Sequence, residues 1–235
     1  MSPPVKFAAA VFPGFQALDL FGPLDTLNII SKQDHPMSLY ILSSTLDPVS
    51  TLHPEDSEED PSAAAPPSKS KGLPFPMSQA IVPTHTFADC PDDVEVLIVP
   101  GGRGCHDPAR IAHVADFVRR RMPRLRFLLT VCTGGGIAAQ AGVLDGLRAT
   151  CNKRALDWII PRYPSVNWAK SARWVVDGNN EEKNNIYTAS GISAGMDMMF
   201  AFVADQYGAE LADRIARQAE YTRSVNPEDD PFARE

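Results

Sequence analysis

A cysteine at the end of an apolar run is the residue of this sequence with the clearest chemical potential. Residues 127–131 are almost continuously apolar, and Cys132 follows them directly, with Thr133 and then Gly134-Gly135-Gly136 behind it. This order predicts a buried strand, a tight turn that presents the thiol, and a helix that opens on small residues. A helix amino terminus lowers the pKa of a nearby thiol. The competing interpretation is a small apolar core residue, but a core cysteine has no need of the glycines, so we favour a nucleophile.

A glycine-rich loop is expected at the same edge of the sheet. Pro100-Gly101-Gly102-Arg103 follows the apolar residues 94–99, and the carboxyl ends of parallel strands meet in one crevice. The backbone N–H groups of Gly101 and Gly102 can stabilise negative charge on a substrate, with Arg103 beside them. A tight turn explains the glycines equally well, and the sequence leaves both interpretations open.

A carboxyl group follows the first predicted strand. Asp19 lies between Leu18, Leu20 and Phe21. A carboxyl in an apolar setting has a raised pKa and can exchange a proton with a thiol. A favourable interaction of an acidic residue with the dipole at a helix amino terminus explains the position of Asp19 at least as well.

These loops need an α/β framework to bring them together. Apolar runs at residues 5–12, 39–43, 94–99, 127–131 and 186–189 predict strands, and helical periodicity is found at 17–30, 109–121, 135–141, 153–160, 194–207 and 209–220. The alternation predicts a doubly wound α/β sandwich, with a mostly parallel sheet and helices on both faces. Residues 174–179 and 186–189 predict a hairpin that makes one sheet edge antiparallel.

The chain is interpreted as one domain over residues 1–235. Its 44% hydrophobic composition is sufficient for one core. Residues 47 to about 76, rich in Pro, Ser, Ala and acidic residues, are predicted to be a mobile surface insertion. The polar tail from about residue 221 is expected to follow the surface or a dimer seam.

Composition excludes several classes of partner. A net charge of -7 argues against nucleic acid, and the one basic stripe, at residues 119–121 with Arg124 and Arg126, is interpreted as a solvated helix face. No signal peptide and no run of about 20 apolar residues is present, so we expect a cytoplasmic protein that does not bind membranes. The cysteines at 90, 105, 132 and 151 form no CxxC, so no disulfide, metal site or cofactor is predicted.

The combined motifs resemble those of the ThiJ/PfpI superfamily. They comprise residues 12–15 with 18–23, 98–102, 131–134 with 141–150, and 189–197. The chain is most similar to the isonitrile hydratase branch, because Asp19 stands where other branches have Glu and Thr133 follows the cysteine. The resemblance implies a flavodoxin-like sandwich and a homodimer, with Cys132 as the nucleophile, Asp19 as its carboxyl partner and Thr133 beside the thiol. It also implies that the Gly101 and Gly102 backbone stabilises charge.

One position departs from this pattern. Many members have His after the strand at 148–150, whereas this chain has Cys151-Asn152. Reactions that need a Cys-His pair therefore lose their general base. Of the histidines at 35, 53, 85, 106 and 113, only His106 is close enough in sequence to the glycine-rich loop to be considered. Cys105 in that loop can act as a resolving thiol or be inert, and we favour the inert interpretation.

The leading functional hypothesis is a cofactor-independent lyase. It hydrates a small isonitrile to an N-substituted formamide through a thioimidate on Cys132. A hydratase, dehydratase or cyclase that acts on another small metabolite would use the same site. A third hypothesis is a redox or ligand sensor, although the roughly 27 residues after Tyr207 are too few for a helix-turn-helix module.

Overall fold

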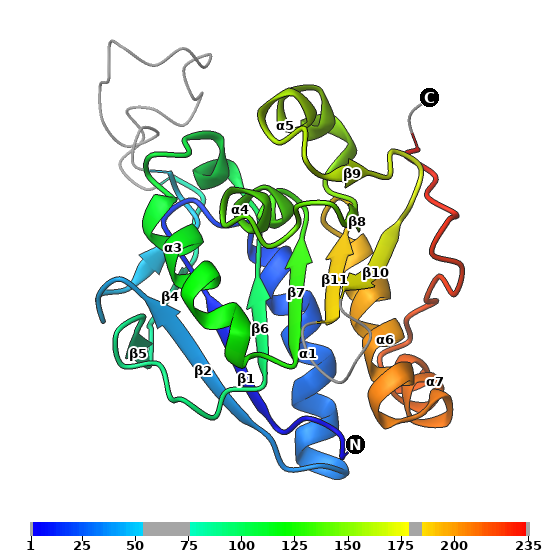
Figure 1. The fold of residues 1–235 in the computed structure, drawn as a ribbon. Coiled ribbons are helices and arrows are strands. Elements are labelled where there is room, and N and C mark those ends of the chain that lie inside the picture. The colour runs from blue at the N-terminus through cyan, green and yellow to red at the C-terminus, as the bar shows by residue number, and fades with distance from the viewer. Residues whose placement is uncertain (1, 54–75, 179–184, 234–235) are drawn as a thin grey trace.

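The computed structural model describes residues 2–53, 76–178 and 185–233. Its centre is a seven-stranded sheet with the order β10-β11-β7-β6-β1-β2-β5 (Figure 1). The strands are β1 (Lys6–Ala10), β2 (Ser38–Ser43), β5 (His85–Thr86), β6 (Val96–Val99), β7 (Phe127–Val131), β10 (Trp174–Gly178) and β11 (Asn185–Ala189). All neighbours pair in parallel except β10 and β11, which are antiparallel. The predicted parallel sheet with one antiparallel edge is confirmed.

The short edge strand β5 was not predicted. It follows a turn and pairs with β2 through only two registered positions, Leu42 with His85 and Ser43 with Thr86. A strand of two residues has no readable alternation of apolar and polar side chains, because one period already spans two residues.

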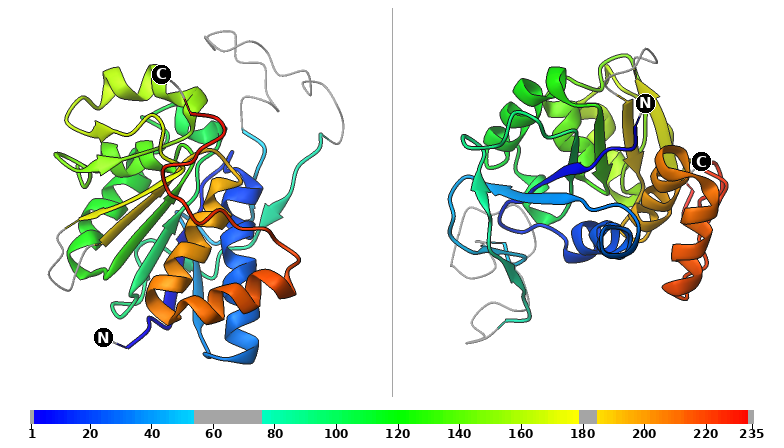
Figure 2. Two further views of the ribbon diagram at one scale, coloured as in Figure 1. Left: turned by 90° about the vertical axis from the view of Figure 1, so that its right-hand side faces the viewer. Right: turned by 90° about the horizontal axis from the view of Figure 1, so that it is seen from below.

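Helices cover both faces of the sheet, as the sequence predicted. Figure 2 shows α1 (Ala17–Gln33), α6 (Ala194–Tyr207) and α7 (Ala209–Gln218) together on one side. The other side carries α3 (Ala112–Arg121) and α4 (Gly134–Gln140). The helix expected from residue 109 begins at Ala112, and a separate 3-10 turn, η1 (Arg103–His106), precedes it. A second 3-10 turn, η2 (Met122–Arg124), follows α3.

A small layer lies above the carboxyl ends of the central strands. It contains β8 (Arg148–Ala149), β9 (Asn167–Trp168), the 3-10 turn η3 (Lys153–Ala155) and α5 (Leu156–Arg162). β8 and β9 pair in parallel as a separate two-stranded sheet. The helix expected over 153–160 is therefore a 3-10 turn followed by an α-helix, and α5 lies beyond the carboxyl ends of the central strands (Figure 1).

The predicted surface insertion was wrong at its start. Val49–Ser50 forms β3, which pairs antiparallel with β4 (Ala80–Ile81). Val49 and His53 are buried, since these residues pack against the domain even though they lie in a polar, proline-containing stretch. The remainder of that prediction, residues 54–75, lies outside the described residues.

The core follows the central strands. Every residue of β6 and β7 is buried, which agrees with strands covered on two faces. The basic stripe is not a simple solvated face, because the Arg121 side chain is buried and pairs with Asp92, and Arg126 pairs with Glu95 at 2.6 Å. Among the described helices, none has both the length and the apolar character that a membrane crossing requires.

Candidate active site

The Cys132 turn has a strained backbone. Cys132 adopts a φ of 57°, a left-handed conformation that is costly for a residue with a Cβ. Its N–H donates to the carbonyl oxygens of Ala189 (3.2 Å) and Ser190 (3.0 Å), which hold the turn against the end of β11. A Cβ on Gly134 would lie within 3.0 Å of the Val99 carbonyl oxygen. The glycine behind the cysteine is therefore required by the close approach of the β6 loop.

Asp19 is fully buried beside this turn. Its Oδ2 accepts a hydrogen bond from the Gly101 N–H at 3.0 Å. Oδ1 is buried without a hydrogen-bond partner among the described residues, and the Cys132 side chain lies close enough to influence the pKa of the carboxyl. Burial raises the pKa of Asp19 to about 7, although the hydrogen bond from Gly101 and the neighbouring Cys132 thiol oppose the rise. The carboxyl can therefore gain and lose a proton near neutral pH.

The glycine-rich loop has a different role from the one predicted. The Gly101 N–H is bound to Asp19, and the Gly102 N–H donates to Thr133 Oγ1 at 2.9 Å. Thr133 Oγ1 in turn donates to the Gly102 carbonyl oxygen at 3.2 Å. Both N–H groups are thus already bonded within the protein, and the prediction that they stabilise substrate charge was wrong in this respect. They position Asp19 and Thr133 instead, because a buried N–H must find an acceptor.

The donors that do face the sulfur come from other loops. The Asn152 side-chain amide donates to Cys132 Sγ at 3.1 Å, from the end of β8. The backbone N–H groups of Ile192 and Thr133 also hydrogen-bond to the thiol and favour its ionised form. Asn152 and Ile192 were not predicted. A positive φ of 37° at Ile192 is visible only in the folded chain, but the polar residue at the family's histidine position was a usable signal for Asn152.

The resting thiol is neutral, which corrects the expectation of a lowered pKa. Burial and the neighbouring Asp19 charge raise the pKa of Cys132 to about 12, and the hydrogen bonds from Asn152, Ile192 and Thr133 only partly oppose them. The α4 amino terminus lies directly behind the thiol, but desolvation is the larger effect at a sulfur that is almost completely buried. The site therefore holds a thiol that has to lose its proton before the sulfur can act as a nucleophile.

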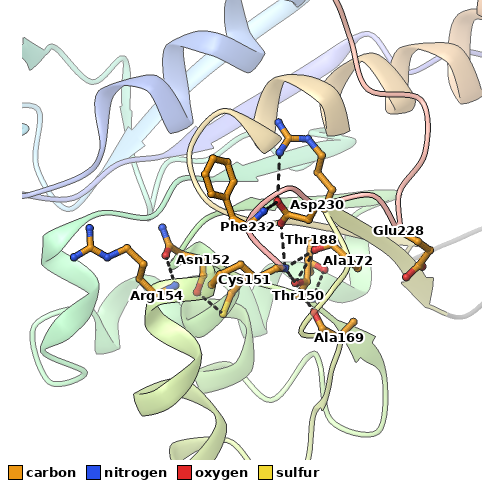
Figure 3. A network of polar contacts seen from close by, with 12 residues as sticks. Thr150, Cys151, Asn152, Arg154, Ala169, Ala172, Thr188, Glu228, Asp230 and Phe232 are labelled. Carbon is orange, nitrogen blue, oxygen red and sulfur yellow. Dashed lines mark hydrogen bonds and ion pairs between the residues drawn. The ribbon is translucent and has the colours of Figure 1, made fainter. Parts of the chain in front are cut away.

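Asn152 lies beside a polar network that includes the carboxyl-terminal tail (Figure 3). Its Oδ1 accepts the Arg154 N–H at 2.9 Å, so one side chain joins the sulfur to η3. The next residue, Lys153, is buried, and its Nζ lies 2.8 Å from Thr150 Oγ1 and 3.4 Å from Asp230 Oδ2. Asp230 also lies 3.6 Å from Arg173, which pairs with Asp197 at 2.6 Å. The tail is thus anchored by buried charges next to the active-site loop.

A cleft of about 480 Å³ opens above Cys132. Its lining residues are Gln16, Gly102, Arg103, His106, Cys132, Thr133, Asn152, Arg154, Ala155, Trp158 and Ile192. The structure thus places the predicted Arg103 at the rim, whereas Asp19 and Gly101 lie beneath it. Cys105 is buried next to Thr133, and desolvation raises the pKa of its thiol. None of the four cysteines at 90, 105, 132 and 151 forms a disulfide. No cluster of three or more His, Cys, Asp or Glu residues within the described ranges is arranged to hold a metal ion.

The sequence matches the DJ-1/PfpI family over residues 6–205. The chain belongs to this family. The match includes the Cys132 turn, Asp19 and Asn152, so the whole candidate site lies within the part of the chain that carries the similarity.

Among curated relatives, the chain is 29% identical over 211 residues to isonitrile hydratase of Pseudomonas putida, which covers 90% of this chain and 76% of that protein. It is also 33% identical over 137 residues to the HTH-type transcriptional regulator GbdR of Pseudomonas aeruginosa. That match covers 58% of this chain and only 35% of the regulator.

Solved structures agree with the fold. A ThiJ/PfpI family protein from Pseudomonas syringae has a TM-score of 0.69 at 26% identity, and the match covers 94% of this chain and 76% of that one. Drosophila melanogaster DJ-1beta has a TM-score of 0.65 at 15% identity, with 94% and 100% covered. The second likeness concerns the fold alone.

Proposed function

We propose that this protein is a cofactor-independent lyase that adds water to a small isonitrile and releases the N-substituted formamide. The observation that carries the proposal is the buried pair of the Cys132 thiol and the Asp19 carboxyl, with the pKa of Asp19 raised to about 7. Asn152, rather than an imidazole, contacts the sulfur, so Asp19 is the group placed to move the proton. The similarity to isonitrile hydratase supports the same reaction.

The first step joins the sulfur to the terminal carbon of the isonitrile. The Asp19 carboxylate accepts the thiol proton as the bond between Sγ and carbon forms, and it returns the proton to that carbon. The product is a thioimidate, in which nitrogen is doubly bonded to a CH group attached to sulfur. The Asn152 amide and the Ile192 N–H stabilise the negative charge that develops on Sγ during the proton transfer.

The second step releases the product. A water molecule, oriented by the Asp19 carboxylate, attacks the thioimidate carbon while the imine nitrogen takes up a proton. The carbon–sulfur bond then breaks, the sulfur recovers a proton, and the formamide leaves. Summed over both steps, one isonitrile and one water give one formamide, and the free thiol is restored.

Turnover of an alkyl isonitrile by the purified protein tests the proposal directly. We expect formamide to accumulate by mass spectrometry, and Cys132→Ala to lose at least about a thousandfold in rate, since a covalent step cannot occur without the sulfur. Cys90→Ala is the matched control, because Cys90 lies in a loop outside the cleft. Absence of turnover while Cys132 remains reduced, or full activity of Cys132→Ala, refutes the proposal.

Two other functions can be tested with the same purified protein. The site is equally able to act on another small electrophile, which a mass-spectrometric screen against cell extract would identify. Similarity to the regulator GbdR favours a ligand sensor as the second candidate. A sensor would bind a small molecule in this cleft without product formation. The neutral thiol argues against a peroxide sensor, because oxidation requires the thiolate.

We also propose that the protein acts as a homodimer in the cytoplasm. Leu18 and Phe21 leave apolar area exposed on α1, which is suited to a second copy of the chain. Four unpaired cysteines are typical of a reducing compartment. Light scattering of the purified protein tests the dimer, and a monomer at micromolar concentration would refute it.

A further inference from the structure

The cleft above Cys132 is lined by positive and neutral side chains. Arg103, Arg154, His106 and Trp158 are among its lining residues, and no Asp or Glu of the described residues lines it. The chain as a whole carries a net charge of -7. A positive cleft on an acidic protein is therefore a local feature and not a consequence of overall composition.

Arg154 is tied to the nucleophile through one side chain. The Arg154 N–H donates to Asn152 Oδ1 at 2.9 Å, while Asn152 Nδ2 donates to Cys132 Sγ at 3.1 Å. Figure 3 shows the Arg154 guanidinium extending past Asn152 on the side away from Asp230. No carboxylate of the described residues forms an ion pair with Arg154, in contrast to Arg148, which Glu228 binds at 2.8 Å. The charge of Arg154 is thus available at the cleft, and the hydrogen bonds through Asn152 fix the position of the Arg154 backbone relative to the Cys132 thiol.

The other rim residues complete a binding surface for a small molecule. Arg103 begins the η1 turn and Arg154 lies in η3, so the two arginines line the cleft from different elements. The His106 and Trp158 rings have centroids 5.3 Å apart with their planes inclined at 58°, and both residues line the cleft. Burial, and next the charge of Arg103, lower the pKa of His106, which agrees with a cation-rich environment.

We propose that the substrate carries a carboxylate, which the cleft binds through Arg154 and Arg103 while its electrophilic carbon reaches Cys132. A guanidinium group offers paired N–H donors whose geometry matches a carboxylate, and the Trp158 ring covers the carbon skeleton between the two ends. The substrate class is therefore a small isonitrile with an acid group. The inference rests on the proposed hydration for the identity of the electrophile, but the recognition of an anion is independent of it.

A matched pair of substrates tests the class. We expect isocyanoacetate to exceed its methyl ester in kcat/KM by at least about 10-fold, because the ester lacks the charge that the guanidinium groups bind. Arg154→Gln should reduce kcat/KM for the acid at least 10-fold more than for the ester, while Arg120→Gln, on the exposed face of α3, is the charge-matched control. Equal kcat/KM values for acid and ester, with the same loss for both in Arg154→Gln, would overturn the inference about the carboxylate. They would leave the proposed hydration of isonitriles unaffected.

A second measurement does not depend on turnover. Iodoacetate and iodoacetamide both alkylate a thiolate with loss of iodide, and they differ in charge. We expect the rate ratio of iodoacetate to iodoacetamide at Cys132, measured by peptide mass spectrometry, to be at least about 10-fold above the ratio for N-acetylcysteine. Arg154→Gln should bring it close to the N-acetylcysteine value. An unchanged ratio in the native protein refutes anion recognition even if no isonitrile is hydrated.

Discussion

Asp230→Asn is expected to destabilise the domain strongly although it lies in the tail. The substitution removes a buried negative charge while it keeps the shape of the side chain. Lys153 and Asp230 have side chains only 4% and 1% exposed, so neither solvent nor salt can replace the missing partner. Breaking one partner of a buried ion pair typically costs about 3–5 kcal/mol. We expect a value near the lower limit, about 3 kcal/mol, because Lys153 keeps Thr150 and Arg173 keeps Asp197.

Thermal unfolding by calorimetry is the assay. For a domain of this size, each kcal/mol shifts the midpoint by about 2–4 °C, which predicts a fall of about 6–12 °C. Glu228→Gln is the matched control in the same tail, because the Arg148–Glu228 pair is about half exposed and exposed pairs contribute little. A midpoint within 1–2 °C of the native protein, by that same conversion, would show that the charges of the cluster do not stabilise the fold.

The pH dependence of this variant provides an independent check. Burial lowers the pKa of Lys153 below its usual value, and the Asp230 charge opposes that shift. Without Asp230 the folded-state pKa falls further. The penalty is therefore fully present while Lys153 is charged in the fold, and it diminishes as pH rises through the folded pKa toward the unfolded one. The stability difference between Asp230→Asn and the native protein should shrink from pH 7 toward pH 10, and a difference that grows would contradict the assignment.

Further predictions concern the site. Asp19→Asn removes a charge that raises the pKa of Cys132, so iodoacetamide should label Cys132 faster at pH 8. The rate of hydration should fall by at least about a hundredfold, because the base is lost. A fall in both the labelling rate and the hydration rate would show that Asp19 only supports the fold. Hydration by the native protein should decline as pH falls through about 7, where the Asp19 carboxylate gains a proton, and a rate independent of pH between 6 and 8, the range around that pKa, would exclude it as the base. Gly134→Ala should lower the free energy of unfolding, measured in urea, by about 2 kcal/mol or more, because the new Cβ meets the Val99 carbonyl. The control is Gly136→Ala in the same helix, where a Cβ has ordinary space. It should leave the free energy of unfolding unchanged or raise it by up to about 1 kcal/mol.

Local patterns in the sequence were sufficient for the framework and for the turn at Cys132. The apolar run before Cys132 and the glycines behind it predicted the strand, the strained turn and the short helix, since these depend on neighbours along the chain. Parallel pairing followed from alternating strands and helices. Asp19 was correctly expected near the thiol because the loops after parallel strands meet at one edge.

Long-range contacts decided how the site works. The sequence predicted a lowered thiol pKa from the helix amino terminus, but burial depends on everything packed around the sulfur and outweighs that effect. The N–H groups of Gly101 and Gly102 are bonded to Asp19 and Thr133, which only the assembled loops reveal. Asn152 reaches Cys132 across 20 positions of sequence. Such partners carry no local periodicity, because their distance is set by the packing of separate elements and not by spacing along the chain.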